Sequence, residues 1–332
     1  MDEKLIFKNI RCCVCVNEYK NNFSTKYDKD NFIVVECNNC SFNFIPQYFS
    51  KQITYKEYKD EKVLEEIRKG NNWLKMQRHL LRFKLIKKYK MEGKLFDLGA
   101  GWGHFLYTGR ELGYDVHGVE VADIPFHYAK NDLDLPVEHI NFFDLKVEDD
   151  TYDIITIWDV LEHIVDADEV MKKCSKMIKN GGYVFIQIPQ IDSFIAKHQK
   201  EKWRMISSGH VNYFSKKTIS SLLEKEGFKV ETIKSSFEFK LFLMYAVLPW
   251  INKFKSGKDG ENINSDSSDE ANKQAFFNKT TNLPKWVLKI IMIIHNLIYN
   301  TISLLGIGDE MIVVARKVAY SYKMNRKAGL KV

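Results

Sequence analysis

Glycines and carboxylates are spaced in one stretch of this 332-residue chain as a nucleotide site would need them. Residues 94–106 read Lys-Leu-Phe-Asp-Leu-Gly-Ala-Gly-Trp-Gly-His-Phe-Leu, and a second apolar run ends at Glu120. The first run ends in Asp97, glycines follow, and the spacing then becomes helical, which predicts strand, tight turn and helix. A carboxylate that closes the second strand of a βαβ unit, such as Glu120, is placed to bind ribose hydroxyls.

The glycine spacing separates two kinds of nucleotide site. A dinucleotide fold needs G-x-G-x-x-G, but the residue three positions after Gly101 is His104. The pattern here is instead Asp97-x-Gly99-x-Gly101-x-Gly103. It resembles motif I of the class I S-adenosylmethionine-dependent methyltransferases.

The resemblance to this family continues along the chain. Residues 153–164 (Asp-Ile-Ile-Thr-Ile-Trp-Asp-Val-Leu-Glu-His-Ile) are similar to the family's fourth strand and its exit loop, and residues 179–189 to its Gly-Gly turn and fifth strand. In total it covers residues 92–237 and 308–317. It implies an α/β fold, a Rossmann-like, doubly wound, mostly parallel seven-stranded sheet, with S-adenosyl-L-methionine as the cofactor.

The same resemblance assigns a cofactor site residue by residue. The acidic residue near the adenine corresponds to Asp144, and the two residues along the methionine moiety correspond to Trp158 and Asp159. For Glu120 an ordinary strand-end charge is the alternative, and for Asp144 an ordinary surface carboxylate. The implied cofactor-binding residues are Asp97, Gly99, Gly101, Gly103, Glu120, Asp144, Trp158 and Asp159.

Two histidines could supply a catalytic base. Methyl transfer from a sulfonium needs positioning and, for oxygen or carbon acceptors, removal of a proton. His163 follows the fourth strand, whereas His210 lies in the loop after the fifth, where family acceptors enter. Histidine titrates in the useful range, and Tyr213 beside His210 can bind hydroxyls. Either histidine could be the base; alternatively, His163 only shapes the cofactor loop and His210 anchors its own loop.

The cysteines gather near the N-terminus in two pairs. Cys12-x-x-Cys15 and Cys37-x-x-Cys40 can each present two thiolates to one tetrahedral ion, which predicts a zinc ribbon. Four thiolates leave no open position, so the Zn²⁺ would be structural. Reduced cysteines without metal are the alternative, and Cys13 could compete with Cys12 as a ligand.

The order of elements predicts how these groups are positioned. Strands are expected near 94–98, 115–120, 137–140, 153–158, 182–188 and 228–236. Helices are expected within 56–90, with a break at Gly70, and near 103–112, 123–131, 167–178 and 216–226, the last capped by Ser215. The predicted domains are a zinc-ribbon-like module (1–50), N-terminal helices (51–91), a methyltransferase core (92–240), a flexible linker with an apolar helix insertion (241–306), and a final strand with a basic tail (307–332).

The segment 286–305 is apolar and long enough to be weighed as a membrane span. Its polar residues draw one narrow stripe, which favours a helix docked on the domain or lying at a membrane surface. The strand expected at 308–317 must return to the sheet, which argues against a span. The stripe consists of Lys289, Asn296, Asn300 and Ser303.

Composition and charge are compatible with this interpretation. A net charge of +7 is spread over many lysines, so it permits an anionic partner without demanding one. The charged start Met-Asp-Glu-Lys predicts no signal peptide, and cysteine usage fits the cytoplasm. We therefore expect a cytoplasmic enzyme, with peripheral contact at the inner membrane face through 286–305 as an added expectation.

The whole layout resembles bacterial sugar methyltransferases associated with polysaccharide biosynthesis. The expected function is methyl transfer from S-adenosylmethionine to a small or lipid-linked acceptor, such as a sugar in nucleotide-sugar or surface-polysaccharide biosynthesis. A quinone-precursor O-methyltransferase and a zinc-ribbon RNA-binding methyltransferase are the alternatives. The ribbon has no cluster of basic and aromatic residues, which argues against nucleic acid.

Overall fold

The protein is described here from a computed structural model. Predictions for the N-terminal ten residues, for the linker within 237–283 apart from residue 278, and for the basic tail beyond 318 lie outside the described residues. The described residues are 11–15, 22–29, 31–46, 61–70, 72–236, 278 and 284–318.

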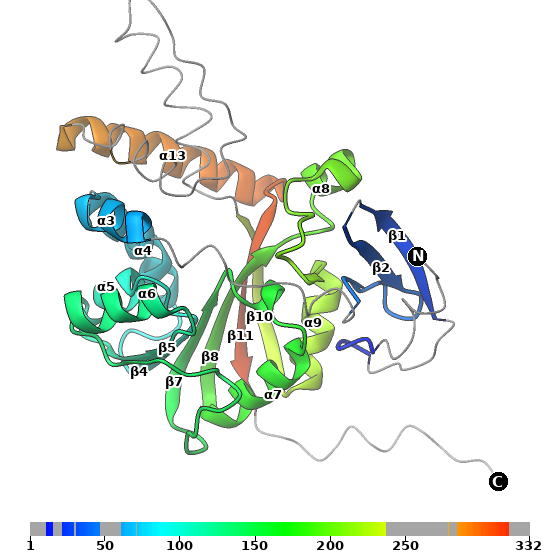
Figure 1. Ribbon diagram of the computed structural model, residues 1–332, viewed down its shortest axis with the longest axis horizontal. Helices are drawn as coiled ribbons and strands as arrows, with labels where there is room; N and C mark the ends of the chain where they lie inside the picture. Colours follow the sequence, from blue (N-terminus) through cyan, green and yellow to red (C-terminus); the bar gives the residue numbers. More distant parts are fainter. Residues whose placement is uncertain are drawn as a thin grey trace, which may run out of the picture.

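A seven-stranded sheet forms the centre of the molecule, in the order β10-β11-β8-β7-β4-β5-β6 (Figure 1). Strands β4 to β8 pair in parallel, and β11 is antiparallel to both of its neighbours. This confirms the predicted mostly parallel Rossmann-like sheet. Its strands are β4 (Lys94–Leu98), β5 (Asp115–Val119), β6 (Val137–Glu138), β7 (Tyr152–Trp158), β8 (Ile178–Pro189), β10 (Phe228–Ser236) and β11 (Glu310–Lys317).

Helices pack on both faces of the sheet, so the fold is doubly wound. One apolar cluster joins α7 and α9 to the strands, and a second joins α4 and α5 to them. The predicted cap at Ser215 is confirmed, because its hydroxyl accepts the N–H of Thr218 in a capping box. The helices are α3 (Glu61–Lys69), α4 (Asn72–Ile86), α5 (His104–Glu111), α6 (Asp123–His127), η2 (Tyr128–Asp132), η3 (Leu161–His163), α7 (Ala167–Met177), α8 (Phe194–Gln199), η4 (Lys200–Lys202), α9 (Lys216–Lys225) and α13 (Lys285–Leu305).

The N-terminal module contributes three strands to a second, smaller sheet, which is antiparallel. Its order is β1-β2-β3-β9, and Figure 1 shows it beside α8 and α9. The fourth strand belongs to the large domain, because β9 follows the loop that carries His210. The module therefore shares a sheet with the predicted acceptor loop. The strands are β1 (Phe23–Asp28), β2 (Ile33–Cys37), β3 (Asn43–Phe44) and β9 (Asn212–Tyr213).

Helix α13 is the predicted apolar insertion, and β11 returns from it to the sheet as expected. The helix contacts β10, and in Figure 1 it extends above α3 and α4. Among the described residues, no helix combines the length and the apolar character that crossing a bilayer requires. Seven of its apolar side chains are nevertheless exposed: Trp286, Ile290, Ile293, Ile294, Leu297, Leu304 and Leu305.

Candidate functional site

The glycine turn after β4 is a tight backbone structure with one open side. Gly99, Gly101 and Gly103 have φ angles of 75°, 52° and 74°, which disfavour other residues. A Cβ at Gly99 would lie 2.6 Å from Val160, and one at Gly103 would lie 2.7 Å from Leu135. A Cβ at Gly101 would meet nothing within 4 Å. The turn is thus packed on both sides of Gly101 and open at Gly101 itself, so a ligand can approach its backbone there.

Glu120 lies beside this open position. Its Oε2 accepts the N–H of Gly101 at 2.6 Å, and its Oε1 accepts the N–H of Ala122 at 2.7 Å. The residue is 8% exposed, and burial raises the pKa of its carboxyl although backbone N–H groups oppose the rise. Each carboxylate oxygen can accept more than one hydrogen bond, so the group keeps acceptor capacity for two hydroxyls. The arrangement fits the ribose of the predicted cofactor.

Asp97 lies at the other end of the turn and is buried. Thr156 Oγ1 lies 2.5 Å from Asp97 Oδ1, which joins β4 to β7. Burial raises the pKa of Asp97 to about 8, so the carboxyl is mainly neutral at pH 7. Asp97 therefore holds the strands through a hydrogen bond more than through charge, and its predicted role as anchor of the turn stays a prediction.

Arg82 of α4 reaches across to the carboxyl ends of the strands. It binds Asp159 and Gln187, each at 3.1 Å, and its guanidinium lies 4.3 Å from the ring centre of Trp158. Asp159 has a φ of 59°, a costly conformation for a residue other than glycine and one that clusters at functional sites. Arg82 thus contacts both predicted residues, Trp158 and Asp159. Arg82 itself was not predicted from the sequence.

Asp144 lies in the turn that follows β6, and its side chain is exposed to solvent. The N–H of Asp144 donates to the carbonyl of Asn141 at 2.9 Å. Phe143 beside it is also exposed, and it borders an open hollow of about 550 Å³ between this loop and α7. The predicted role of Asp144 near an adenine stays a prediction.

His163 and His210 are brought together although they are far apart in sequence. Their ring centres are 4.8 Å apart and the rings are nearly perpendicular. His163 Nδ1 lies 2.6 Å from the carbonyl oxygen of Gly209, and His210 Nδ1 lies 2.9 Å from that of Met205. Because a carbonyl only accepts, we assign a proton to Nδ1 of each ring.

Glu162 completes this cluster and was not singled out from the sequence. It is 2% exposed, and its Oε2 has no hydrogen-bond partner among the described residues. Burial, and then the negative charge of Asp159, raise the pKa of Glu162 well above its ordinary value. Burial, and then His163, lower the pKa of His210 to about 4, so its ring is neutral at pH 7. One donor atom each from Glu162, His163 and His210 lies within 4.8 Å of the others.

Tyr213 and Asn212 hold the loop that carries His210. The buried Tyr213 hydroxyl donates to the carbonyl of Ser207 at 3.0 Å, and burial raises its pKa. The Asn212 side-chain amide donates to the carbonyl of Ile164 at 2.6 Å, next to η3. The loop is therefore fixed to the exit of β7, and the predicted part of Tyr213 in catalysis stays a prediction.

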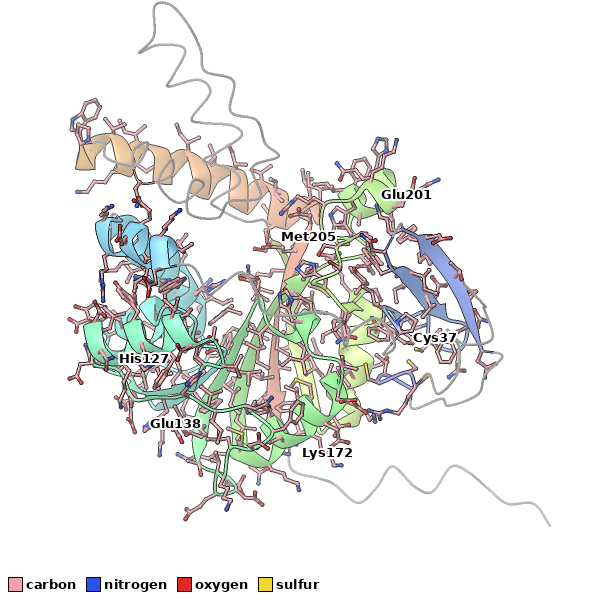
Figure 2. The ribbon with its side chains drawn as sticks, in the orientation of Figure 1. Cys37, His127, Glu138, Lys172, Glu201 and Met205 are labelled. Carbon is pink, nitrogen blue, oxygen red and sulfur yellow. The ribbon has the colours of Figure 1, made fainter. Side chains whose placement is uncertain are left out.

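The four predicted cysteine ligands converge in the N-terminal module. The sulfurs of Cys12 and Cys40 are 3.5 Å apart, those of Cys15 and Cys37 are 3.6 Å apart, and all four lie within 4.8 Å. Thiolates 2.3 Å from a tetrahedral zinc would be roughly 3.8 Å apart, so the group fits the ion. The hydrogen bond from Cys12 lowers the pKa of Cys40 to about 5. Figure 2 labels Cys37 at this position. Cys13 is buried and lies outside the group.

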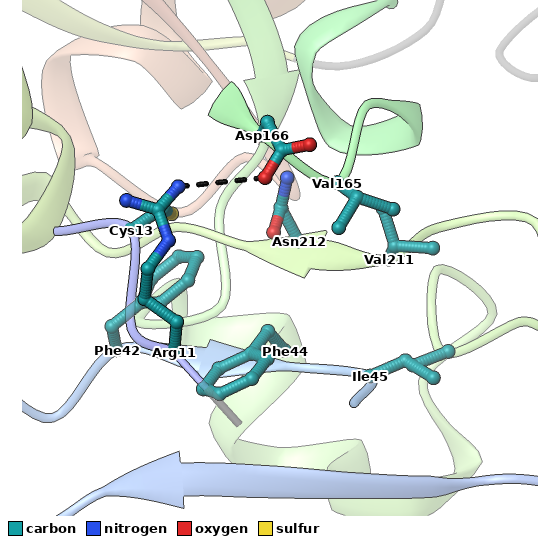
Figure 3. A pocket seen from close by; sticks show the side chains of 9 residues that line it. All are labelled: Arg11, Cys13, Phe42, Phe44, Ile45, Val165, Asp166, Val211 and Asn212. Atoms are coloured by element: carbon teal, nitrogen blue, oxygen red, sulfur yellow. Dashed lines mark hydrogen bonds and ion pairs between the residues drawn. The ribbon is translucent and has the colours of Figure 1, made fainter. Parts of the chain in front are cut away.

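An ion pair joins the module to the large domain. Arg11 binds both oxygens of Asp168 on α7, at 2.6 and 2.8 Å. It also forms an ion pair with Asp166 at 3.4 Å, drawn as a dashed line in Figure 3. Both residues line a small cavity together with Phe42, Asn212 and others. The contact is bidentate and partly buried, so it orients the module as well as attaching it.

Comparisons with known proteins find a family that is similar to part of this chain. Residues 69–233 match the family described as "Methyltransferase domain". The Ubiquinone biosynthesis O-methyltransferase of Acinetobacter baylyi is 29% identical over 99 residues, which are 28% of this chain and 42% of the relative. That of a Shewanella species is 31% identical over the same shares of the two chains. The chain thus spans about two fifths of the length of these curated relatives.

Solved structures include similar chains. An S-adenosylmethionine-dependent methyltransferase from Mesorhizobium loti is 12% identical, with a TM-score of 0.45 over 71% of this chain and 96% of that one. The family match and the strand order β10-β11-β8-β7-β4-β5-β6 agree on the class of fold. Residues 69–233 therefore match a methyltransferase domain, and the fold is the Rossmann-like α/β fold of methyltransferases.

Proposed function

We propose that the protein transfers a methyl group from S-adenosylmethionine to a small or lipid-linked acceptor, in the first instance a sugar of nucleotide-sugar or surface-polysaccharide biosynthesis. The observation that carries methyl transfer is the open backbone at Gly101 beside Glu120. It lies at the carboxyl end of β4, next to β7, where the strand order reverses and doubly wound sheets bind ligands.

The residues of the turn would hold the cofactor in a fixed pose. Glu120 would accept hydrogen bonds from the ribose hydroxyls while it keeps the N–H groups of Gly101 and Ala122. Asp159, fixed by Arg82, would face the methionine portion. When bound, the cofactor supplies a methyl group on a sulfonium, which has an excellent leaving group. The protein then has to orient the acceptor and deal with its proton.

The histidine pair supports proton removal from the acceptor. With Nδ1 of His163 and of His210 bonded to carbonyls, Nε2 is the basic position of each ring. His210 is neutral at pH 7 and offers an unprotonated nitrogen, but burial lowers its pKa to about 4, below the range expected from the sequence, so the ring is a weaker base than an imidazole in water. Tyr213 and Asn212 fix the loop that carries it. We assign the base to His210, with His163 as the neighbour that orients it.

Quinone-precursor O-methylation is the second candidate. The curated relatives quoted above are named for ubiquinone biosynthesis, at about 30% identity over 28% of this chain. The two candidates differ in the acceptor, which is an aliphatic hydroxyl or activated carbon of a sugar in one and an aromatic hydroxyl in the other.

An acceptor screen tests both candidates. The purified full-length chain is incubated with methyl-labelled S-adenosylmethionine and either nucleotide-linked deoxysugars or catechol-type quinone precursors, and labelled products are identified by mass. Label in a sugar supports the first proposal, and label only in a catechol supports the second. His210→Ala serves as the inactive control, and Glu111→Ala, an exposed substitution at the end of α5, as the active one.

We further propose that the cysteine group holds one structural Zn²⁺ and that α13 rests on the cytoplasmic face of the inner membrane. The exposed apolar side chains of α13 support the second point. Co-sedimentation with anionic lipid vesicles tests it. Ile293→Gln with Leu297→Gln should reduce binding, and an unchanged bound fraction would refute membrane contact through 286–305.

A further inference from the structure

A second group of metal-ligating side chains lies beside the predicted acceptor loop, apart from the cysteines. We propose that Glu162, His163 and His210 bind a divalent transition-metal ion, and that the ion holds an acceptor through two adjacent oxygen atoms. The ion site follows from the geometry of these three residues. The acceptor class rests on the proposed methyltransferase function.

The imidazoles are oriented as metal ligands are. Nδ1 of His163 and Nδ1 of His210 each lie within hydrogen-bond distance of a backbone carbonyl. Metal-binding histidines typically donate their other ring N–H to a carbonyl or carboxylate in this manner, which fixes both tautomer and ring orientation. The ring centres are only 4.8 Å apart, and one nitrogen of each ring lies within 4.8 Å of the other and of a Glu162 oxygen, close enough to share an ion.

Glu162 supplies the negative ligand and an independent indication of a cation. Its Oε2 is buried without a hydrogen-bond partner among the described residues. A buried carboxylate oxygen in that state is unfavourable, and a bound cation would compensate it. The guanidinium of Arg82 is bonded to Asp159 and Gln187.

The ligands come from two segments that are fixed to each other. Glu162 and His163 belong to η3, and His210 belongs to the acceptor loop. The N–H of Val211 donates to the carbonyl of Glu162 at 2.7 Å, so the three side chains share one rigid frame. Two imidazoles and one carboxylate form a set used in catalytic zinc and non-haem iron sites, where the remaining positions bind water or substrate.

The open positions indicate which acceptors fit. A small molecule with neighbouring hydroxyls, or a hydroxyl beside a carbonyl, can chelate the ion through both oxygens. The ion lowers the pKa of the bound hydroxyl, so its O–H bond breaks and the proton passes to solvent. The oxygen then forms a bond to the methyl carbon, and the carbon–sulfur bond breaks with its electron pair returning to sulfur. His210 would in this case act through the ion rather than take the proton itself.

Titration with Co²⁺ tests the site directly. Full-length protein loaded with a single equivalent of Zn²⁺ is used, so that the four thiolates hold the zinc and the second site stays open to Co²⁺. Co²⁺ binds thiolates more weakly than Zn²⁺ and should leave the cysteine site intact. Calorimetry gives stoichiometry and affinity, and absorption spectra distinguish cobalt–thiolate bonds from nitrogen and oxygen ligation. Glu162→Gln and His210→Asn remove ligands, and His117→Asn on β5 is the matched control.

We expect one equivalent of Co²⁺ to bind without a thiolate band. Its affinity should fall at least about tenfold in Glu162→Gln and His210→Asn, and stay unchanged in His117→Asn. The proposal is overturned if wild-type protein binds no Co²⁺ beyond the cysteine site, or if both ligand variants bind as wild type. The wild-type stoichiometry decides even where a variant does not fold.

The same samples keep the two proposals apart. Failure to bind S-adenosylmethionine would sink the proposed function and leave the Co²⁺ result standing. Methyl transfer that persists in strong chelator, from protein that takes up no Co²⁺, would sink the metal site and leave the proposed function standing.

Discussion

Replacement of Glu120 by alanine should weaken S-adenosylmethionine binding by about 10- to 150-fold. The ribose hydroxyls would lose the carboxylate that accepts their hydrogen bonds, and bonds to a charged group contribute roughly 1.5–3 kcal/mol. The structure adds a second effect. The N–H groups of Gly101 and Ala122 would lose their acceptor, so the free protein should also unfold more readily. A buried donor without a partner costs about 1–3 kcal/mol.

The two effects are separated by measuring them independently. Calorimetry at a temperature where each variant is fully folded gives the affinity, and thermal unfolding without cofactor gives the stability. Glu120→Gln keeps the size of the side chain and one acceptor oxygen, so it should lose less of both. Glu111→Ala controls for removal of a carboxylate at an exposed position, the end of α5.

The reasoning fails on either of two results. If Glu120→Ala binds S-adenosylmethionine within about twofold of wild type, Glu120 does not bind the ribose. If the wild-type chain binds NAD as tightly as S-adenosylmethionine, the glycine turn does not select the cofactor that its spacing predicts.

Three further predictions follow from the site. Cys37→Ser should lower zinc from about one equivalent to near zero in metal analysis, and should lower turnover more than cofactor affinity; a metal-free variant with normal turnover contradicts this. His210→Ala should lower kcat by roughly 10²–10⁴-fold with cofactor affinity within a few-fold, whereas a loss confined to His163→Ala would reverse their roles. Because burial raises the pKa of Asp97 to about 8 in the folded protein, folding takes up a proton between about pH 4 and pH 8. The free energy of unfolding therefore falls as pH rises through that window, by at most about 1.4 kcal/mol per pH unit from this group. Urea unfolding of wild type and Asp97→Asn at several pH values should show this fall in the difference between their free energies of unfolding.

Features set by neighbouring residues were predicted well from the sequence. The apolar run of β4 was placed at its observed bounds, 94–98, because a strand between a polar segment and glycines has clear ends. The break at Gly70 separates α3 from α4, and Ser215 caps α9. Strand β8 instead begins at Ile178, before the Gly-Gly turn, where pairing with Tyr152 of β7 extends it.

Features that depend on distant partners were missed. Arg82 looked like one more basic residue of a helix, and only the fold brings it to Asp159 and Gln187. Glu162 was passed over in favour of the neighbouring histidine, since nothing in the sequence says which side of a short turn faces inward. Two adjacent polar residues in the short segment that follows a buried strand were the signal that could have raised it.

The position of β9 explains why a module with only structural ligands can matter to the reaction. Asn43 pairs with Tyr213 and Phe44 with Asn212, so β3 and β9 form one ladder. The second cysteine pair lies just before β3 in the chain, and His210 lies just before β9. Order imposed on the knuckle by the proposed zinc would therefore pass through two strands to the predicted acceptor loop. The glycine turn receives its order from the parallel sheet instead, and for that reason loss of zinc should leave cofactor binding largely intact.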